Sequence, residues 1–285
     1  LDPVTQQWLF WMIFIAFAIK MPIFPFHTWQ PDTYEQAPTS VTIVLSALMV
    51  KMGLFAVVRW LLPVVPAGVA FWSDTVIIMS IIGIVYASFI AIVQTDLKRL
   101  VAYSSIAHMG LMSAAAFSQS NVGMHGLMVQ MFNHGINITG MWLIVSMVEQ
   151  RWGTRDMTKL GGMASTAPQM AIALVIISLA NIALPLTNGF VGEFMLFNGL
   201  FQGVSNYHIT FMVVAGLGII LGAIYTLNMI QKSAYGNATE MVIAKDLSLN
   251  EYIGLGIIIT IILVLGVYPK PLLDMTASVA TMIVP

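Results

Sequence analysis

Three ionisable residues lie inside long apolar runs of this sequence. Lys20 ends the run LFWMIFIAFAIK, Lys51 lies within SALMVKMGLF, and Glu193 lies within GFVGEFMLF. A charge at the centre of a bilayer costs at least about 2.5–3.5 kcal/mol, so such residues are usually functional. Lysine and glutamate can bind and release a proton, and burial tunes the pH at which they do so. An ion pair that fastens two helices is the alternative for each residue, and we favour proton transfer.

Polar residues without a permanent charge occur in the same apolar surroundings: His27, His108, Gln130, His134 and Asn137. The last three are spaced so that they share one helical stripe. Histidine titrates near neutrality and can pass a proton in either direction, so these residues could line a hydrated relay. A lone histidine in a helix is more often a hydrogen-bonded packing residue. The sequence leaves both interpretations open for His108 and His134.

The composition identifies the surroundings that must hold these residues. Of 285 residues, 59% are hydrophobic and 8% are charged, whereas a soluble globular domain carries roughly a quarter charged residues. The chain is therefore expected to lie in a membrane. Its formal net charge of -1 gives no reason to expect nucleic acid as a partner. The absence of cysteine excludes disulfides and cysteine-held iron–sulfur clusters within this chain.

We expect an all-α, polytopic transmembrane helix bundle, because only helices or closed barrels satisfy the backbone in lipid. A span needs about 20 mainly apolar residues. The chain begins with LDPVTQQW and has no initiator methionine, so we expect it to be the later part of a longer protein. The sequence predicts about eight spans, near residues 6–29, 38–62, 74–95, 98–118, 123–148, 167–202, 207–232 and 250–268.

Two of the predicted spans contain helix-breaking residues. Pro22 and Pro25 interrupt the first span, and Pro185 and Gly189 interrupt the sixth. Each proline removes a backbone donor and crowds the preceding turn, so both spans should be discontinuous helices. A packing kink explains either break alone. Two breaks, each near an ionisable residue, favour an ion site of the kind found in transporters with inverted repeats.

The basic residues predict an orientation. Seven lie in loops on one side, and two, Arg59 and Lys270, lie on the other. By the positive-inside rule the richer side is cytoplasmic, which places both ends of the chain on the outer, periplasmic side. The seven are Lys98, Arg99, Arg151, Arg155, Lys159, Lys232 and Lys245.

Four segments together resemble the antiporter-like membrane subunits of respiratory complex I, the NADH:quinone oxidoreductase. They are KMPIFPFHTWQPDTYEQAPT, LMVKMGLFAVVRW, QTDLKRLVAYSSIAHMG and TNGFVGEFMLF. The resemblance implies the latter part of a fourteen-helix fold with two inverted repeats. Within one membrane domain, 1–62 would end the first repeat, 74–236 would form the second, and 250–285 would be a C-terminal helix.

The resemblance also implies roles for individual residues. The family's central channel lysine falls on Lys20, its bridging lysine on Lys51, and the ionisable residue of its second broken helix on Glu193. Sister subunits carry lysine at this last position. Lys98 matches a further basic residue of the family, and its place near the surface favours anchoring of a loop. The carboxylate that pairs with the channel lysine belongs to an earlier helix of the family.

The function implied by the resemblance is proton translocation coupled to quinone reduction elsewhere in the complex. This chain would hold no metal or cofactor, whereas other subunits would hold FMN, iron–sulfur clusters and a quinone. The expected partners are other membrane subunits, with sister antiporter-like subunits on both sides, and the lipid of a bacterial inner membrane. Enzymatic activity would belong to the whole complex, with no redox catalysis by this chain alone.

Two rival functions remain open from the sequence. A subunit of a multi-subunit cation/proton antiporter or of a membrane-bound hydrogenase would share this fold, and Glu193 argues against it. A non-transporting assembly subunit would use its lysines only to pair with neighbouring helices. The subunits that purify with the chain would separate complex I from an antiporter.

Overall fold

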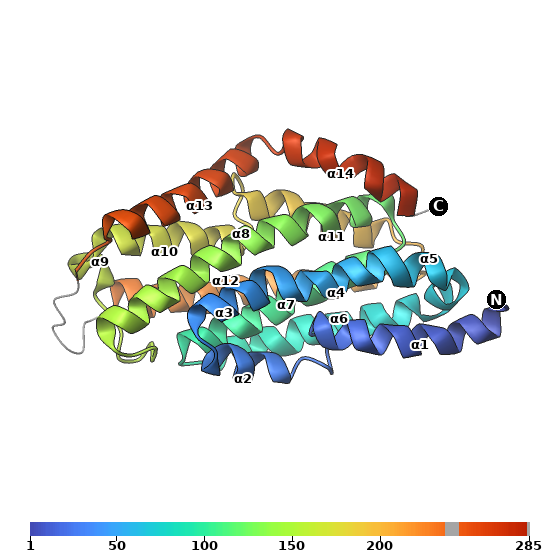
Figure 1. Ribbon diagram of the computed structural model, residues 1–285, viewed down its shortest axis with the longest axis horizontal. Coiled ribbons are helices and arrows are strands. Elements are labelled where there is room, and N and C mark those ends of the chain that lie inside the picture. Colours follow the sequence, from blue (N-terminus) through green and yellow to red (C-terminus); the bar gives the residue numbers. More distant parts are fainter. Residues whose placement is uncertain (237–244, 284–285) are drawn as a thin grey trace.

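The computed structural model describes residues 1–236 and 245–283. All regular elements in these two ranges are helices, as the composition predicts. Most of the helices lie along one axis and form an elongated bundle (Figure 1). Both ends of the chain lie at the same end of this bundle.

The first predicted span is interrupted at the expected place. Helix α1 (Pro3–Lys20) ends directly before the two prolines, and α2 (Trp29–Gln36) begins after a stretch of turns. The indole of Trp29 donates a hydrogen bond of 2.9 Å to the carbonyl oxygen of Ile19, which ties the start of α2 to the end of α1. Pro22 and Pro25 thus separate two short helices, because neither proline can continue the backbone ladder.

The second predicted span is continuous but irregular. Its α-helical pieces alternate with two π-helical turns, in which the backbone bonds skip one extra residue. The pieces are α3 (Thr39–Val44), η1 (Leu45–Met49), α4 (Val50–Ala56), η2 (Val57–Leu61) and α5 (Leu62–Val64).

Three long helices form the centre of the bundle: α6 (Pro66–Val93), α7 (Leu97–Phe117) and α8 (Asn121–Trp152). Nearly every residue of α7 is buried, so α7 is the central helix. Small residues allow it to approach α6 closely: a Cβ on Gly110 would lie 2.9 Å from the carbonyl oxygen of Ser80. Close approach of this kind is how membrane helices gain packing energy without a hydrophobic driving force.

The sixth predicted span is two helices, because the break at Pro185 separates α10 from α11. The remaining elements are α9 (Met163–Thr166), α10 (Pro168–Asn181), α11 (Asn188–Phe201), α12 (His208–Ile230), η3 (Gln231–Tyr235), α13 (Leu249–Val267) and α14 (Lys270–Ile283). The C-terminal unit, expected as one helix, contains both α13 and α14, with Pro269 between them. Residues 284–285 of that unit lie outside the described residues.

Five helical segments in the described residues are long and apolar enough to cross a membrane: 39–64, 66–93, 97–117, 208–235 and 249–267. The other three predicted spans, 6–29, 123–148 and 167–202, are not among these five segments, for local reasons. The first and sixth are divided by their breaks, and α8 carries many polar residues. The third begins at Pro66, well before the predicted residue 74, because PAGVAFWS continues the apolar pattern into the helix.

The buried apolar residues form two main clusters. One joins α1, α4 and α6 to the Phe117 end of α7, and the other joins the Leu97 end of α7 to α8, α10, α12 and α13. Ser104, Asn133 and His134 are buried polar residues on α7 and α8, the two helices that take part in both clusters, and His108 on α7 is partly buried. The division of the chain into 1–62, 74–236 and 250–285 stays a prediction.

Candidate functional site

Glu193 and His108 form a largely buried pair of ionisable side chains. The Oε1 atom of Glu193 lies 3.1 Å from Nδ1 of His108, and both side chains are largely buried. The amide of Gln130 donates a longer hydrogen bond, 3.4 Å, to the same carboxylate oxygen. Helices α11, α7 and α8 each contribute one of these groups, so the pair depends on three segments that are distant in the sequence.

His134 continues the polar contact from His108. The two imidazole rings have centroids 5.1 Å apart and are tilted by 57°. Both ring nitrogens of His134 and Nε2 of His108 are buried and have no hydrogen-bond partner within residues 1–236 and 245–283. His134, on the stripe predicted for α8, thus lies directly against the histidine that contacts Glu193.

Lys51 approaches this region from the irregular second span. Its ammonium donates a hydrogen bond of 2.5 Å to the carbonyl oxygen of Ser46. In a regular α-helix the N–H of Val50 would take that carbonyl, but in the π-helical turn it bonds to Leu45. The widened turn therefore leaves the Ser46 carbonyl available to the lysine.

The π-helical turn packs against α8 beside His134. A Cβ on Gly135 would lie 3.4 Å from the carbonyl oxygen of Ala47, one residue from the acceptor of Lys51. Lys51 is itself buried, with 7% of its surface exposed. The span that carries Lys51 therefore packs against α8 next to His134.

The break between α10 and α11 is held by amide side chains of α8. Asn137 donates to the carbonyl oxygen of Ala180 at 3.1 Å, and Asn133 donates to the carbonyl oxygen of Asn188 at 2.8 Å. The first acceptor lies in the last turn of α10, where a helix leaves carbonyls without intrahelical partners, and the second belongs to the first residue of α11. Asn137 therefore holds the broken backbone through its amide nitrogen.

Gly189 is required for the same arrangement. A Cβ at this position would collide with the carbonyl oxygen of Ala180, so only glycine allows the start of α11 to pass so close to the end of α10. Within the break, Ala183 and Leu186 adopt positive φ angles of 56° and 75°. Such angles are uncommon for residues other than glycine and indicate a backbone held by its surroundings.

A small cavity of about 30 Å³ adjoins the Glu193–His108 pair. It is lined on one side by these two residues and on another by Tyr225 of α12. One water molecule needs about 10–15 Å³ of such volume. The cavity can therefore hold about two water molecules next to the carboxylate.

Lys20 lies at the last position of α1 and is half-buried. The next residue, Met21, packs against the second span: a Cβ on Gly53 would lie 2.8 Å from its Cβ and its backbone nitrogen. Lys20 forms no ion pair with any carboxylate of residues 1–236 and 245–283. The structure therefore places Lys20 at the first break, one residue before a close contact with α4.

His27 lies in a different environment from the other candidate histidines. Its ring stacks on Phe24 at a centroid distance of 5.7 Å and meets Tyr86 edge-on at 5.4 Å. No contact joins it to the pair on α7 and α11 in the part of the chain that the structure describes. Its predicted role in a pathway stays a prediction, and its contacts are those of a packing residue.

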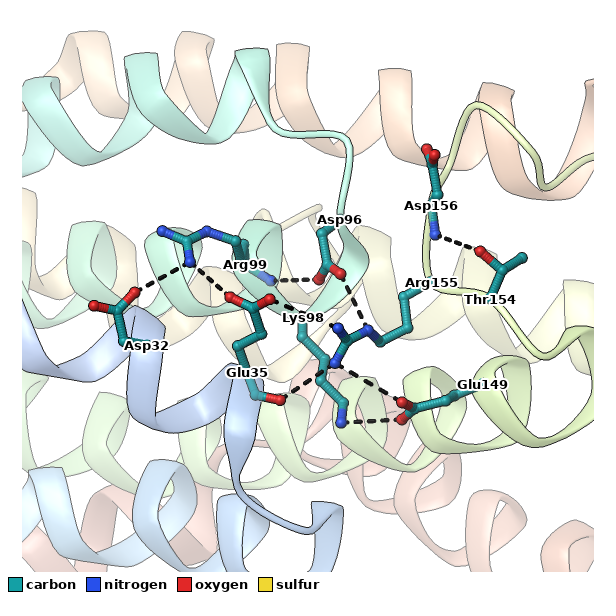
Figure 2. A network of polar contacts seen from close by, with 9 residues as sticks. All are labelled: Asp32, Glu35, Asp96, Lys98, Arg99, Glu149, Thr154, Arg155 and Asp156. Atoms are coloured by element: carbon teal, nitrogen blue, oxygen red, sulfur yellow. Dashed lines mark hydrogen bonds and ion pairs between the residues drawn. The ribbon is translucent and has the colours of Figure 1, made fainter.

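Lys98 belongs to a surface network at one end of the bundle, not to the buried site. Its ammonium forms an ion pair of 3.0 Å with Glu149. In Figure 2 it lies among the carboxylates and arginines that join α2, α7 and the loop after α8. Glu35, Asp96 and Glu149 all contact Arg155 of that loop.

Sequence reasoning missed three residues that the structure brings to the site. Tyr225 donates a hydrogen bond of 3.0 Å to the hydroxyl of Ser104, and Asn181 donates one of 3.2 Å to the same hydroxyl. The sequence carries a partial signal for Asn181, a polar residue four positions before Pro185. Tyr225 carries none, because tyrosine is common in membrane helices.

No group of three or more His, Cys, Asp or Glu side chains in the described residues is placed to hold a metal ion. The polar groups near the Glu193 carboxylate are an imidazole, an amide and a phenol hydroxyl. Their shared capacity is to accept and donate protons along hydrogen bonds.

Comparison with known proteins gives a consistent family. The model of the family described as NADH:quinone oxidoreductase/Mrp antiporter, transmembrane, matches residues 2–222. NADH-quinone oxidoreductase subunit M of Rickettsia bellii is 41% identical over 272 residues, which is 95% of this chain and 54% of that protein. The chain thus spans about half the length of the curated relatives it matches.

Two solved structures share the fold. A chain of respiratory complex I from Thermus thermophilus with bound NADH superposes with a TM-score of 0.89 at 28% identity, covering 99% of this chain and 60% of that one. A chain of the Mrp complex from Dietzia gives 0.88 at 17% identity, covering 96% of this chain and 59% of that one, and supports the fold alone. The match over most of its residues shows that the chain belongs to the NADH:quinone oxidoreductase/Mrp antiporter transmembrane family.

Proposed function

We propose that this chain forms the latter part of a proton-translocating membrane subunit of an NADH:quinone oxidoreductase. The proposed path runs through Lys51, His134, His108 and Glu193. The observation that carries the proposal is the contact of Glu193 with His108, because it joins two exchangeable groups inside the bundle. Family membership and the likeness to subunit M support the same function.

Buried ring nitrogens support a hydrated path. Buried polar atoms are almost always hydrogen-bonded, and those without a protein partner are usually satisfied by water. Three such nitrogens lie on His108 and His134. The cavity beside Glu193 has room for water at the far end of the row. Water between the side chains would complete a chain of donors and acceptors.

The chemistry needs no covalent step. A proton released by the Lys51 ammonium passes through water to His134, and His108 then delivers a proton to the Glu193 carboxylate. Each imidazole accepts at one nitrogen and releases from the other, so it returns to its neutral form after the ring or the hydrogen bonds reorient. Glu193 is a suitable terminus because its carboxylate can accept a proton and release it again.

We assign Lys20 to the entry of this path, at the first broken helix. Its position beside the Met21–Gly53 contact connects it mechanically to the span that carries Lys51. Lys98 is assigned to loop anchoring through Glu149. A pathway role for His27 is not included, because its contacts are aromatic.

The driving reaction would occur in other subunits. Quinone reduction there would move charge toward the Lys20 end of the path, and the proton on Glu193 would leave in response. FMN, iron–sulfur clusters and quinone would belong to those subunits, and this chain offers no cysteine for a cluster. Sister membrane subunits and lipid of a bacterial inner membrane would cover its exposed apolar faces.

The basic end of the bundle is proposed to face the cytoplasm. Seven basic residues lie in the loops or adjoining helix ends of that end. Lys159→Cys, in the exposed loop after α8, should react with an impermeant maleimide only after cells are permeabilised, whereas Val204→Cys, exposed after α11, should react in intact cells. Labelling of the position 159 cysteine in intact cells would reverse the orientation.

The function is tested at Glu193 in the full-length protein within its assembled complex. Glu193→Gln keeps the hydrogen-bonding shape but cannot exchange a proton, so NADH-driven proton pumping in membrane vesicles should fall by about 100-fold. Glu193→Asp keeps the acid and should retain substantial pumping. Native gels should show normal assembly for both variants.

A fastening role for Glu193 predicts the opposite order. The amide would then be partly tolerated, and Glu193→Ala would yield unstable complexes. Wild-type pumping by a fully assembled Glu193→Gln complex would refute the proposed function and favour a non-transporting subunit.

A further inference from the structure

Tyr225 separates two cavities inside the bundle. The larger cavity has a volume of about 30 Å³ and is lined by Tyr225, His108 and Glu193 among others. The smaller, about 10 Å³, is lined by Tyr225 again, with Ser104, Asn181 and Thr226. Each volume is of the order needed for one or two water molecules. The tyrosine is 2% exposed, so its only neighbours are the protein and these two spaces.

The two cavities lie at successive levels of α7. The larger one is lined by Ala107, His108 and Leu111, and the smaller one by Leu100, Val101 and Ser104. The smaller cavity is therefore about two helical turns nearer to Leu97, the end of α7 that carries the surface network. Tyr225 and Ser104 stand between the Glu193 site and that end of the bundle.

The hydroxyl of Ser104 is the meeting point of three side chains. It accepts hydrogen bonds from the Tyr225 hydroxyl at 3.0 Å and from the Asn181 amide at 3.2 Å. A serine hydroxyl that accepts twice still has its own proton to donate. The Oδ1 atom of Asn181 is buried without a protein partner and can accept a proton donor in the smaller cavity.

We infer that Tyr225, Ser104 and Asn181 form a hydroxyl relay that connects the Glu193 cavity to the loop end of the bundle. This inference rests on the proposed function and adds a second access route to Glu193. Tyr225 and Ser104 pass the proton, and Asn181 is a positioning residue that orients the serine hydroxyl.

The relay conserves every proton. A proton from water beside Glu193 binds the Tyr225 oxygen while Tyr225 gives its own proton to Ser104. Ser104 in turn gives its original proton to an acceptor in the smaller cavity. Both hydroxyls are neutral before and after the transfer, and rotation about their C–O bonds restores the starting arrangement. The same steps run in reverse when the proton moves toward Glu193.

The test compares Tyr225→Phe with Tyr207→Phe in the assembled complex. Both changes remove one hydroxyl, and Tyr207 is the matched control because it is exposed at the start of α12. Tyr225→Phe should lower NADH-driven pumping by about tenfold. This loss is smaller than the loss of about 100-fold expected for Glu193→Gln. Glu193 holds the transferred proton itself, whereas Tyr225 only relays it. Tyr207→Phe should match the wild type.

A kinetic signature separates a relay from a packing role. The solvent deuterium isotope effect on turnover should rise in Tyr225→Phe, because proton passage becomes slower, and it should stay unchanged if the hydroxyl only stabilises the fold. Ser104→Ala should lower pumping similarly, and the double variant should be no worse than Tyr225→Phe alone. If Tyr225→Phe reduces assembly on native gels, Ser104→Ala decides by the same measurements.

The outcomes distinguish the relay from the function on which it rests. Full pumping by assembled Tyr225→Phe or Ser104→Ala, beside an inactive Glu193→Gln, would overturn the relay and leave the proposed function standing. Full pumping by all three variants would overturn both.

Discussion

The buried pair and the surface network use the same contact for different purposes. Glu193 lies 3.1 Å from His108, and Asp96 lies 3.1 Å from Arg155. Histidine can lose its proton near neutral pH, whereas the guanidinium of arginine stays charged in proteins. The first contact can therefore exchange a proton, and the second can only hold two segments together.

The two regions also differ in how their polar atoms are satisfied. The histidines around Glu193 leave buried nitrogens without protein partners, which allows water to continue the path. Arg155 contacts three carboxylates, from Glu35, Asp96 and Glu149 (Figure 2). Its guanidinium stays protonated and therefore does not take part in proton transfer. Weak bases that still have free hydrogen-bonding atoms are suited to proton transfer. Permanent charges whose hydrogen bonds are all made are suited to anchoring.

The largest effect expected from this comparison comes from His108→Gln. The amide can still donate to Glu193 but cannot exchange a proton, so pumping should fall by about 100-fold with assembly preserved. His125→Gln is the matched control, because the His125 ring forms a hydrogen bond of 3.0 Å with the carbonyl oxygen of Leu273 in α14, away from the pair. Equal pumping by both variants in the vesicle assay would remove the distinction between the two regions.

A smaller and different effect is expected for Arg155→Ala. Removal of the guanidinium leaves three carboxylates close together, so the assembled complex should lose about 1–3 kcal/mol of stability while its pumping per assembled complex stays normal. Thermal unfolding of the purified complex measures the loss, which should shrink at high salt. Lys159→Ala, in the same loop but without an ion pair among the described residues, should leave the unfolding temperature unchanged. A pumping defect in Arg155→Ala at full assembly would show that the network takes part in transport.

The smallest effect is expected for Asp32→Asn. The side chain of Asp32 is 74% exposed, and its partner Arg99 keeps a shorter contact of 2.6 Å with Glu35. Exposed ion pairs contribute about 0–1 kcal/mol, so the unfolding temperature should hardly change. Glu35→Gln, which weakens contacts to both Arg99 and Arg155, should lower it more. A reversed order would mean that exposure does not rank the contacts of this network.

Parts of the fold follow from local sequence alone. Both helix breaks were predictable because a proline acts on its own turn, wherever the rest of the chain lies. The buried placement of Lys51 and Glu193 was predictable because a long apolar run forms a helix in lipid. The π-helical turn at Ser46 was not, since nothing in the sequence SALMVKMGLF distinguishes a π turn from an α turn.

The surface network was only partly predictable. The sequence indicated an anchoring role for Lys98 from its place near a helix start, but it did not identify Glu149 as the partner. The loop after α8 reaches α2 and α7 only in the folded chain, where Arg155 contacts carboxylates from three other elements. Charge patterns in loops indicate a side of the membrane, whereas their partners depend on how the loops fold back.

The sequence by itself determined the membrane class, the two interrupted helices, the stripe of Gln130, His134 and Asn137, and the resemblance to one family. Tertiary structure alone decided that His108 contacts Glu193, that His27 packs among aromatic rings, and that Tyr225 meets Ser104 and Asn181. The physical reason is range. Helix formation, proline breaks and helical stripes depend on neighbours within a few residues of the sequence. Each contact of the site instead joins two helices, and their relative rotation is set by packing. The glycine contacts that let α11 approach α8 and α10 are part of that packing.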